Sequence, residues 1–534
     1  MCSLRSAADP VPGTARPHGV PAGPGGPGQP RPRGRGHPCT GVSVVGVRPV
    51  DAQSPTPAAR PALVPVLIYL AMVVAVISSL GAPLVPAIAE ANDVSITSAQ
   101  WSLTVTLVVG AVATPVIGRL GDGRHRRTVV LVVLAVVLAG SVLSALPLGL
   151  GWLIAGRGLQ GVGLGLTPLA IATARTALAG ERSRSTVAAL SVTVAAGVGL
   201  GYPLTGAIAE FGGVHAAFWF GAAASAVAIV AAAVVYPPSP DVPPRRLDVA
   251  GALLLAVALS SGLLALGEAE RWGWTSPAVL GLAALAVVTL LGWGAWQLRT
   301  DTPLVDLRLA RGRTAATAHG AALLVGMANY LLLSSVPRLV QEPESTGYGF
   351  GASIVVAGLV LVPFSVASFL ASRLARTLER VAGRRLVLPA GAVVLGAGDL
   401  LAGFVREDLW QLFLAMAVVG LGVGTVFAAL PGLIVAAVPA QETGSAMSLN
   451  QVLRYIGFSI GTALSATVLE AATPAGAGAP SSGGYSAVAV IAAVSCAALA
   501  LLTALLPGRT PAAGTAPAQD SATAAAGAPH APRA

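Results

Sequence analysis

Ionisable side chains are scarce in this sequence, and those within apolar stretches are its candidate chemical groups. Arg157 and Arg454 fall inside apolar runs, Asp399 is the acid that lies well inside one, and Glu210 lies at the end of another. A charge at the centre of a bilayer costs roughly 2.5–3.5 kcal/mol on insertion scales, so each such residue needs a partner, water or a function. A buried arginine binds anions or backbone carbonyls, and a buried acid with a tuned pKa exchanges protons.

Other chemistry is excluded by residues that the sequence lacks. All 32 basic residues are arginine, because the chain contains no lysine. A phosphate-binding loop of the GxxxxGK[ST] type and a Schiff-base lysine are therefore impossible. The three cysteines, Cys2, Cys39 and Cys496, have neither metal-ligand spacing nor the pattern of a disulfide framework. The sequence therefore predicts no enzyme activity, no metal site and no cofactor.

The composition indicates an integral membrane protein. Only 10% of the 534 residues are charged and 54% are apolar, whereas soluble globular proteins carry roughly 25% charged residues. Such a chain cannot cover the water-facing surfaces of several domains, so a soluble enzyme, a disordered scaffold and a collagen-like fibre are disfavoured. The absence of lysine beside abundant alanine, glycine, valine and arginine also indicates GC-rich coding and a bacterial source.

Apolar runs of about 20 residues, long enough to cross roughly 30 Å of hydrocarbon, recur along the chain. We therefore expect an all-α membrane protein with fourteen transmembrane helices, separated by Pro, Gly or charged residues. Residues 1–60 and 507–534, rich in Pro, Gly, Arg or Ala, are predicted to be disordered cytoplasmic tails. The expected spans are 62–88, 99–119, 127–148, 152–175, 184–209, 216–236, 247–267, 277–297, 314–337, 349–373, 384–404, 408–434, 442–471 and 485–506.

The placement of arginine predicts the orientation. With the N-terminus inside, seventeen arginines fall in the cytoplasmic loops, against Arg271, Arg338 and Arg406 outside. Because positive loops stay on the cytoplasmic side, this asymmetry predicts a multi-pass protein of the cell membrane with both termini cytoplasmic. The formal net charge of +10 is then a topology signal, and no nucleic-acid partner is predicted.

An internal repeat indicates two related halves. Arg126 and Arg127 recur as Arg384 and Arg385, 258 residues later, and glycines of the fourth and fifth expected spans recur 259 and 260 residues later. Both halves begin on the same side, as in parallel transporter repeats that rock about a central site. The predicted units are a six-helix first half, a two-helix insert and a six-helix second half, over 61–240, 241–300 and 301–506.

The loop after the second expected span combines a glycine, an acid and a basic pair: Gly118, Asp122, and Arg126 with Arg127. Gly118 permits close helix packing, and Asp122 lies at a predicted membrane edge among arginines that can pair with it. The pattern resembles the signature loop of the major facilitator superfamily, with His125 where that family usually has glycine.

This resemblance implies that the loop is a gate latch. In such a latch the carboxylate faces the N-terminus of a helix from the other half, where exposed N–H groups favour an anion. Here that helix would begin near Thr443. The alternative is an ordinary basic cytoplasmic turn, but the mirrored basic pair after the tenth span favours the latch. Its gating residues would be Gly118, Asp122, Arg126 and Arg127.

Further segments resemble the fourteen-span drug:proton antiporter branch of that superfamily, over about residues 62–506. Arg157 with Gln160 is similar to the second family motif, and the run from Gly197 to Pro203 looks like the antiporter motif. For Arg157 the resemblance implies assistance in proton transfer or anion binding, and bonding to backbone carbonyls is the structural alternative. The other matches are Arg246-Leu-Asp248, Pro303 to Arg308, and Glu442-Thr-Gly444 leading to Asn450 and Arg454.

Proton coupling is implied by the resemblance, although one acid of the branch is missing. Its members commonly carry an Asp several residues before the position of Pro86, where this chain has Val76-Ile77-Ser78-Ser79. Glu210 and Asp399 therefore become the candidates for coupling. By the repeat, the helix that carries Asp399 corresponds to a peripheral helix of the fold. The candidate transport and coupling residues are Arg157, Pro203, Glu210, Asp399 and Arg454.

By analogy with the family, a substrate would bind between the halves near mid-membrane. Polar and aromatic side chains on the relevant spans suit an amphipathic small molecule held by stacking and a few hydrogen bonds. Alternatively, each of them joins neighbouring helices. Because the inner charges are arginines, neutral or anionic amphiphiles are favoured over cations. The candidate substrate-binding residues are Trp101, Gln160, Asn329, Tyr330, Asn450 and Tyr455.

The sequence therefore predicts a monomeric secondary active transporter that exports drug-like or amphipathic small molecules by alternating access and proton antiport. Its partners would be the small-molecule substrate, protons and the lipid bilayer. The alternative on the same fold is a proton-independent facilitator or importer of a small solute. A membrane enzyme or a channel is disfavoured, because the sequence has no run of metal ligands, no Ser/His/Asp constellation and no filter-like repeat.

Overall fold

The computed structural model describes residues 61–80, 84–94, 96–238, 247–310, 312–474 and 479–505, and every regular element in these ranges is a helix. The predicted tails, 1–60 and 507–534, lie outside the described residues. In chain order the helices are α1 (Leu63–Ser79), α2 (Val85–Ala91), α3 (Ile96–Gly121), α4 (Arg126–Ala145), α5 (Leu150–Gly161), η1 (Val162–Gly165), α6 (Leu166–Ala177), α7 (Gly180–Val235), α8 (Val249–Trp272), α9 (Pro277–Arg299), α10 (Leu307–Ala310), α11 (Arg313–Gln341), η2 (Glu344–Thr346), α12 (Ile354–Leu359), α13 (Leu361–Ala382), α14 (Arg384–Phe404), α15 (Leu409–Ala437), η3 (Ala440–Glu442), α16 (Thr443–Ala471) and α17 (Ser482–Ala504).

Eleven helices in the described ranges are long and apolar enough to cross a membrane, whereas fourteen spans were expected. The expected span 62–88 is divided between α1 and α2, and the span 152–175 between α5, η1 and α6. The expected spans 184–209 and 216–236 are joined as α7, in which Gly213 breaks the helical geometry with a φ of 74°. Glycine adopts this left-handed backbone without strain, so the chain bends there.

Polar side chains satisfy the first turns of several helices. Asp248 accepts a hydrogen bond from the Gly251 N–H at 2.8 Å at the start of α8. Ser276 accepts from the first turn of α9, and Asp408 forms a reciprocal capping box with Gln411 at the start of α15. These caps pair N–H groups that have no partner inside the helix.

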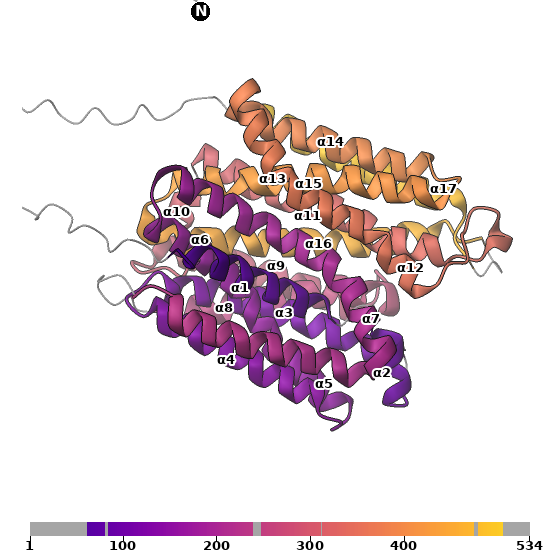
Figure 1. Ribbon diagram of the computed structural model, residues 1–534, viewed down its shortest axis with the longest axis horizontal. Coiled ribbons are helices and arrows are strands. Elements are labelled where there is room, and N and C mark those ends of the chain that lie inside the picture. The colour runs from indigo at the N-terminus through magenta and orange to yellow at the C-terminus, as the bar shows by residue number, and fades with distance from the viewer. Residues whose placement is uncertain are drawn as a thin grey trace, which may run out of the picture. The chain divides into compact units, whose positions relative to one another are not determined.

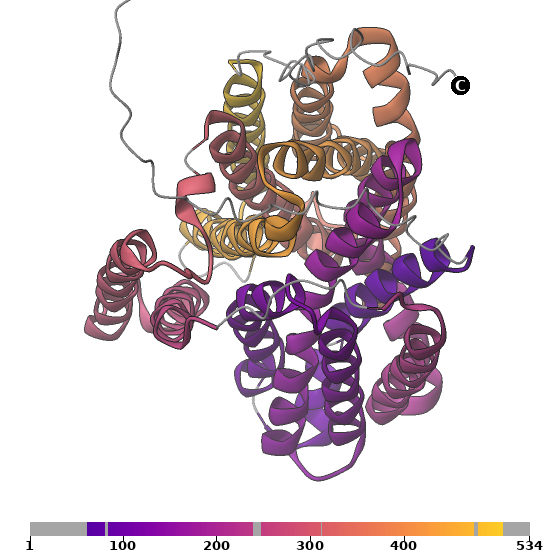
Figure 2. The same cartoon turned by 90° about the vertical axis from the view of Figure 1, so that its left-hand side faces the viewer.

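The helices pack as two groups with a separate pair beside them. In the first half, a name we give to residues 61–240, α7 packs against α1 and α4. In the second half, residues 301–506, α11 packs on α16, and α15 packs on α13 and α14. The halves meet where α7 contacts α13 and α15, and where α16 contacts α3 and α6 (Figure 1). Helices α8 and α9 pack on each other, and α8 also contacts α3 and α16 (Figure 2).

Residues about 260 positions apart make equivalent contacts in the two halves. A Cβ placed on Gly161 would lie 2.4 Å from the carbonyl oxygen of Thr106, and one placed on Gly420 would lie 2.2 Å from that of Phe364. Both glycines therefore allow a neighbouring helix backbone to approach more closely than any side chain permits. The sequence repeat is thus matched by helix-to-helix contacts of the same kind.

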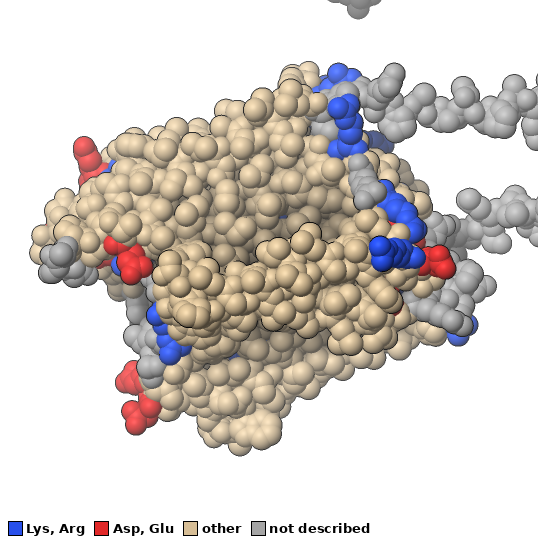
Figure 3. All heavy atoms as spheres, turned by 180° about the vertical axis from the view of Figure 1, so that it is seen from behind, with Lys and Arg blue, Asp and Glu red and all other residues tan. Residues whose placement is uncertain are grey.

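Charged side chains gather at the ends of the helices and leave a broad uncharged surface between them (Figure 3). One end holds the connections α3–α4, α6–α7, α13–α14 and α15–α16, and most arginines lie there. We call it the arginine-rich end. The uncharged middle carries many exposed large apolar side chains, especially on α9, as a lipid-facing surface requires.

Candidate functional site

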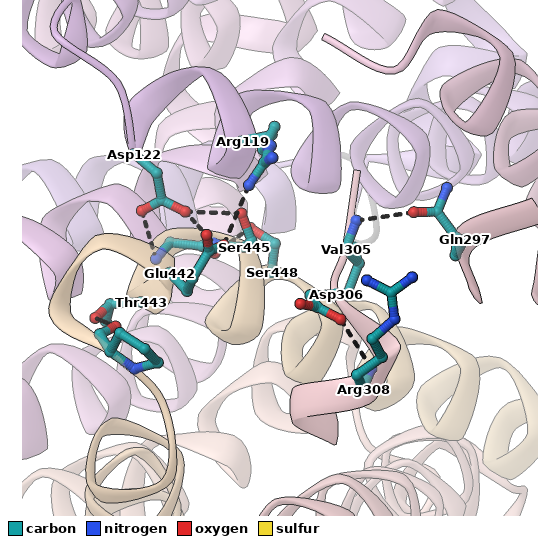
Figure 4. A network of polar contacts seen from close by, with 12 residues as sticks. Arg119, Asp122, Gln297, Val305, Asp306, Arg308, Glu442, Thr443, Ser445 and Ser448 are labelled. Atoms are coloured by element: carbon teal, nitrogen blue, oxygen red, sulfur yellow. Dashed lines mark hydrogen bonds and ion pairs between the residues drawn. The ribbon is translucent and has the colours of Figure 1, made fainter. Parts of the chain in front are cut away.

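The connection between α3 and α4 carries Asp122 to the N-terminus of α16. Its Oδ1 accepts a hydrogen bond from the Gly444 N–H at 2.8 Å, and its Oδ2 accepts from the backbone N–H and the hydroxyl of Ser445 at 2.8 and 2.7 Å. Asp122 is only 1% exposed and faces the first turn of α16 (Figure 4). Helix α16 begins at Thr443, as the sequence predicted. Three hydrogen bonds thus join the first half to the second.

The electrostatics of this contact combine burial with a helix terminus. Burial raises the pKa of Asp122, and the hydrogen bonds from Ser445 and Gly444, with the charge of Arg126, oppose that rise without reversing it. The N-terminus of α16 presents N–H groups without helical partners and the positive end of the helix dipole, so it stabilises a carboxylate. The contact therefore pairs a buried carboxyl group with N–H groups that have no partner inside α16.

Gly118 brings α3 close enough to α16 for this contact. A Cβ at position 118 would lie 1.9 Å from the Ser448 hydroxyl oxygen and 2.9 Å from the Gly444 carbonyl oxygen. Both distances are shorter than a carbon atom tolerates against another helix. Gly444 is equally restricted, because a Cβ there would lie 2.5 Å from Asp122 Oδ1. The site therefore requires glycine on both helices.

Two arginines add contacts between the halves that the sequence analysis did not assign. Arg119 forms an ion pair with Glu442 at 3.1 Å, and the two side chains are only 7% and 19% exposed. Arg175, near the end of α6, donates to the carbonyl oxygen of Val438 at 3.0 Å and to the Thr443 hydroxyl. The position of Arg119 between Gly118 and Asp122 could have indicated that it contacts the other half. Nothing in the sequence near Arg175 indicated a partner about 260 residues away.

Arg126 and Arg127, predicted as gating residues, hold the loop to the first half. Arg126 donates to the Gly121 carbonyl oxygen at 2.7 Å and to the Thr176 hydroxyl at 2.8 Å. Arg127 donates to the carbonyl oxygen of Ala233 at 2.6 Å. Arg126 is 4% exposed and lies close enough for its charge to act on Asp122. The pair therefore positions the loop, while Asp122 and Arg119 reach across to the second half.

Arg157 is completely buried within the first half. It donates to the Ile77 carbonyl oxygen at 2.9 Å, to the Ser102 carbonyl oxygen at 3.3 Å and to Gln160 Oε1 at 2.6 Å. Gln160 in turn donates to the Ser141 hydroxyl at 3.0 Å. These contacts tie four helices together, which corresponds to the structural alternative stated for Arg157. Gln160 belongs to this network as well.

The second half contains a different polar and aromatic group. Arg454 is 5% exposed, donates to Gln451 and lies over the Phe427 ring with its guanidinium carbon 4.6 Å from the centroid. Gln451 also donates to the Tyr455 hydroxyl at 2.6 Å. Arg454 Nε has no hydrogen-bond partner among the described residues. The group thus holds a buried cation whose hydrogen-bonding capacity is not exhausted.

Three further candidates lie near this group on α11 and α16. Tyr330 stacks on the Phe458 ring with centroids 4.0 Å apart. Asn450 donates to the Ala318 carbonyl oxygen at 3.0 Å, which joins α16 to α11. Asn329 is 3% exposed, and its Oδ1 has no partner among the described residues. Tyr330 and Asn329 therefore offer a ring face and an acceptor, whereas Asn450 joins two helices.

The remaining candidates are scattered. Asp399 is completely buried on α14, which packs on α15 and α17, and it accepts a hydrogen bond from Cys496 at 3.3 Å. Trp101 is half-buried in α3, distant in sequence from the latch loop. Pro203 lies inside α7 beside Gly358 of α12. The side chain of Glu210 lies outside the described residues.

The two-helix insert is joined to the bundle by a small polar network. Asp248 accepts hydrogen bonds from Trp296 at 3.1 Å and from Gln297 at 2.9 Å. Gln297 accepts from the backbone N–H of Val305 at 3.2 Å, and Asp306 accepts from that of Arg308 at 2.9 Å (Figure 4). Asp248 and Asp306 are therefore structural residues at the ends of the insert.

The described residues form a helical bundle with an uncharged, apolar flank, which defines a multi-pass membrane protein, and the buried carboxyl group of Asp122 joins its two halves. Residues 67–298 and 318–531 match the family model of the Major Facilitator Superfamily. The chain belongs to this family, whose members are transporters and not enzymes.

Similar proteins carry several transport descriptions. The chain is 30% identical over 401 residues to a triacylglyceride transporter of Mycolicibacterium smegmatis, covering 70% of this chain and 69% of that protein. It is 27% identical over 377 residues to the multidrug resistance protein Stp of Mycobacterium tuberculosis, covering 70% and 68%. The solved structure of a human organic anion transporter shares the fold with a TM-score of 0.59 at 15% identity, covering 83% of this chain and 100% of that one.

Proposed function

We propose that this protein is a secondary active transporter that exports drug-like or amphipathic small molecules by alternating access. The observation that carries the proposal is the contact of Asp122 with the N-terminus of α16, which joins the halves through groups that water can also satisfy. Alternating access requires a closure of this kind, stable when formed and separable when the halves rock. Family membership supplies the transport function itself.

The proposed topology places the latch on the cytoplasmic side. We place fourteen spans in the cell membrane of a bacterium, with both termini on the cytoplasmic side. This arrangement accounts for the concentration of arginine at one end of the bundle. In this orientation, closing the contact between Asp122 and α16 seals the cytoplasmic entrance, and opening it admits substrate from the cytoplasm. The transporter is proposed to act as a monomer.

The proposed substrates are neutral or anionic amphiphiles. Arg454 provides a buried cation, Tyr330 and Phe458 provide stacked rings, and Asn329 provides an acceptor. An amphipathic molecule would stack on the rings and place its polar group near Arg454. The names of two relatives, a multidrug resistance protein and a triacylglyceride transporter, agree with an amphipathic substrate.

The test is transport into everted vesicles, in which export appears as accumulation of substrate inside the vesicle. It is measured with and without an imposed pH gradient. Candidate substrates come first from a growth-inhibition panel that compares cells with and without the gene. Accumulation that exceeds that of vesicles lacking the protein supports transport. Accumulation equal to those vesicles for every compound that the panel identifies would contradict the proposed export.

Proton antiport is the coupling proposed for this export, with Asp399 and Glu210 as the candidate groups. Antiport predicts that the pH gradient drives accumulation and that Asp399→Asn or Glu210→Gln abolishes this dependence. The alternative is a proton-independent facilitator or importer, and the location of Asp399 favours it, because α14 packs on α15 and α17. Transport that ignores the gradient and survives both substitutions would establish the alternative and exclude antiport through these acids.

A further inference from the structure

A cavity separates the two halves at a second place on the arginine-rich end. It has a volume of about 610 Å³ and lies between the start of α7 in the first half and α13, α14 and α15 in the second. Four arginines and two glutamates line it, so its formal charge is positive. These residues are distinct from those of the latch. The charged residues that line the cavity are Glu181, Arg184, Arg376, Glu379, Arg380 and Arg384.

The internal repeat relates this cavity to the latch. At the latch, Arg126 of α4 donates to the Ala172 carbonyl oxygen of α6 at 3.5 Å. At the cavity, Arg384 of α14 donates to the Gly432 carbonyl oxygen of α15 at 2.8 Å. The donors are 258 residues apart and the acceptors 260, the same offsets that the sequence repeat shows. The two places are therefore equivalent positions in the two halves.

This equivalence shows that arginine occupies the cavity positions that correspond to the glycine and aspartate residues of the latch. Residues at the end of α3 correspond to residues 258 positions later at the end of α13. Residues at the start of α7 correspond to residues 260 positions later at the start of α16. At the latch, glycine permits contact and aspartate supplies the negative charge. The equivalent residues are Arg376 for Gly118, Arg380 for Asp122 and Arg184 for Gly444.

Two glutamates, Glu181 and Glu379, balance only half of the four arginine charges that line the cavity. Glu181 pairs with Arg184 at 3.6 Å, but the two side chains are 66% and 74% exposed, so the pair contributes little. No side chain caps the first turn of α7, whose N-cap residue is Ala179. Long cationic side chains that face each other across the cavity repel, which weakens the contact of the start of α7 with α13. A negative charge from outside the chain would remove this repulsion.

We propose that this cavity binds a phosphate-bearing anion, which supplies the negative charge that Asp122 supplies at the latch. The planar guanidinium forks of Arg376 and Arg380 match the geometry of phosphate oxygens. The phosphate source is either the headgroup of an anionic phospholipid or free inorganic phosphate. The site is independent of the transported substrate, so it stands even where the proposed export fails.

Binding is tested with the purified full-length protein in a neutral detergent. Thermal unfolding is followed while dioleoylphosphatidylglycerol, or sodium phosphate at constant ionic strength, is added. Ligand that binds the folded state raises the unfolding temperature. We expect one of the two to raise it in a saturable manner, with the half-maximal concentration about tenfold higher in Arg376→Gln and in Arg380→Gln. Dioleoylphosphatidylcholine and sodium chloride serve as the matched additives.

Arg373→Gln is the control variant, because it removes the same charge from the same helix but does not line the cavity. It should retain the wild-type half-maximal concentration. If either cavity variant does not fold, Arg184→Gln on α7 replaces it. Saturation by the lipid alone assigns the headgroup, and saturation by phosphate assigns the free anion. No saturable shift with either ligand, or equal shifts in the wild type and all cavity variants, would overturn the proposal.

Discussion

Asp122 accepts two hydrogen bonds from Ser445, one from the backbone N–H at 2.8 Å and one from the hydroxyl at 2.7 Å. The two residues are 323 positions apart and belong to different halves of the bundle. The backbone N–H is available because it lies in the first turn of α16, where no helical carbonyl faces it. A single carboxylate thus holds one half against a helix terminus of the other.

Asp122→Asn should lower the rate of substrate efflux about tenfold while leaving the amount of inserted protein unchanged. The amide keeps the shape of the carboxyl group, but its NH2 places a donor where Ser445 already donates, so a donor of Ser445 loses its acceptor. Losing a charged hydrogen bond costs about 1.5–3 kcal/mol. Initial efflux rates, normalised to the protein in the membrane, measure the effect.

Asp301→Asn provides the matched control for this change. It removes the same charge from an exposed loop residue between α9 and α11, outside the contact with α16. Its efflux rate should equal that of the wild type. Equal rates for Asp122→Asn and the wild type would show that transport does not depend on this latch.

Exchanging the charges of Arg119 and Glu442 tests the second contact between the halves. Arg119→Glu and Glu442→Arg should each reduce efflux, because each leaves two like charges at about the 3.1 Å separation of the present pair. The double variant restores opposite charges and should recover part of the activity. We expect a coupling free energy on the order of 1 kcal/mol, since the pair is only partly exposed. Purely additive losses would contradict a direct interaction.

Gly118→Ala should separate α3 from α16. The new methyl group would lie 1.9 Å from the Ser448 hydroxyl oxygen and 2.9 Å from a backbone oxygen, so the helices must move apart. Overpacking of this kind costs about 1–3 kcal/mol. Hydrogen exchange of the amides of Gly444 and Ser445 should become faster. Gly123→Ala, whose Cβ would meet its nearest atom at 3.4 Å, should leave that exchange slow; equally slow exchange in both variants would exclude the predicted separation.

The latch should weaken as the pH rises. Burial makes the pKa of Asp122 higher in the closed latch than in an exposed aspartate, whose pKa is about 3.9. The closed form therefore binds a proton more tightly, so its stability falls as the pH rises from about 4 through the raised pKa and then stays constant. Protection of the Gly444 and Ser445 amides, corrected for intrinsic exchange, should follow this course.

In Asp122→Asn, the part of the pH dependence that comes from Asp122 should disappear, because its carboxyl group is absent. Protection in the wild type that increases with pH would show that the ionised carboxylate is favoured by the closed latch, contrary to this prediction. Other titratable groups also lie near this contact. They are Arg119, Arg126, Arg175, Glu442, Asp306 and His319.

Much of this protein can be predicted from its sequence because a bilayer imposes strong local rules. Long apolar runs with satisfied backbone groups must be helices, and the described residues contain no other regular element. The family resemblance rested on short motifs such as the loop from Gly118 to Arg127, and the family model confirms it. The number of fourteen spans stays a prediction, because eleven of the described helices are long and apolar enough to cross a membrane. Breaks such as Gly213 and the division of α5 from α6 depend on how neighbouring helices pack.

The sequence by itself determined the class of the protein, the family and the candidate status of Asp122, since these depend on composition and local spacing. Only the tertiary structure decided what each charged residue contacts. Arg157 bonds carbonyls within one half, Arg119 reaches Glu442 of the other, and Arg376 and Arg380 line a cavity. The physical reason is that a hydrogen bond depends on angstrom-scale distance in space, and helices far apart in sequence set that distance when they pack.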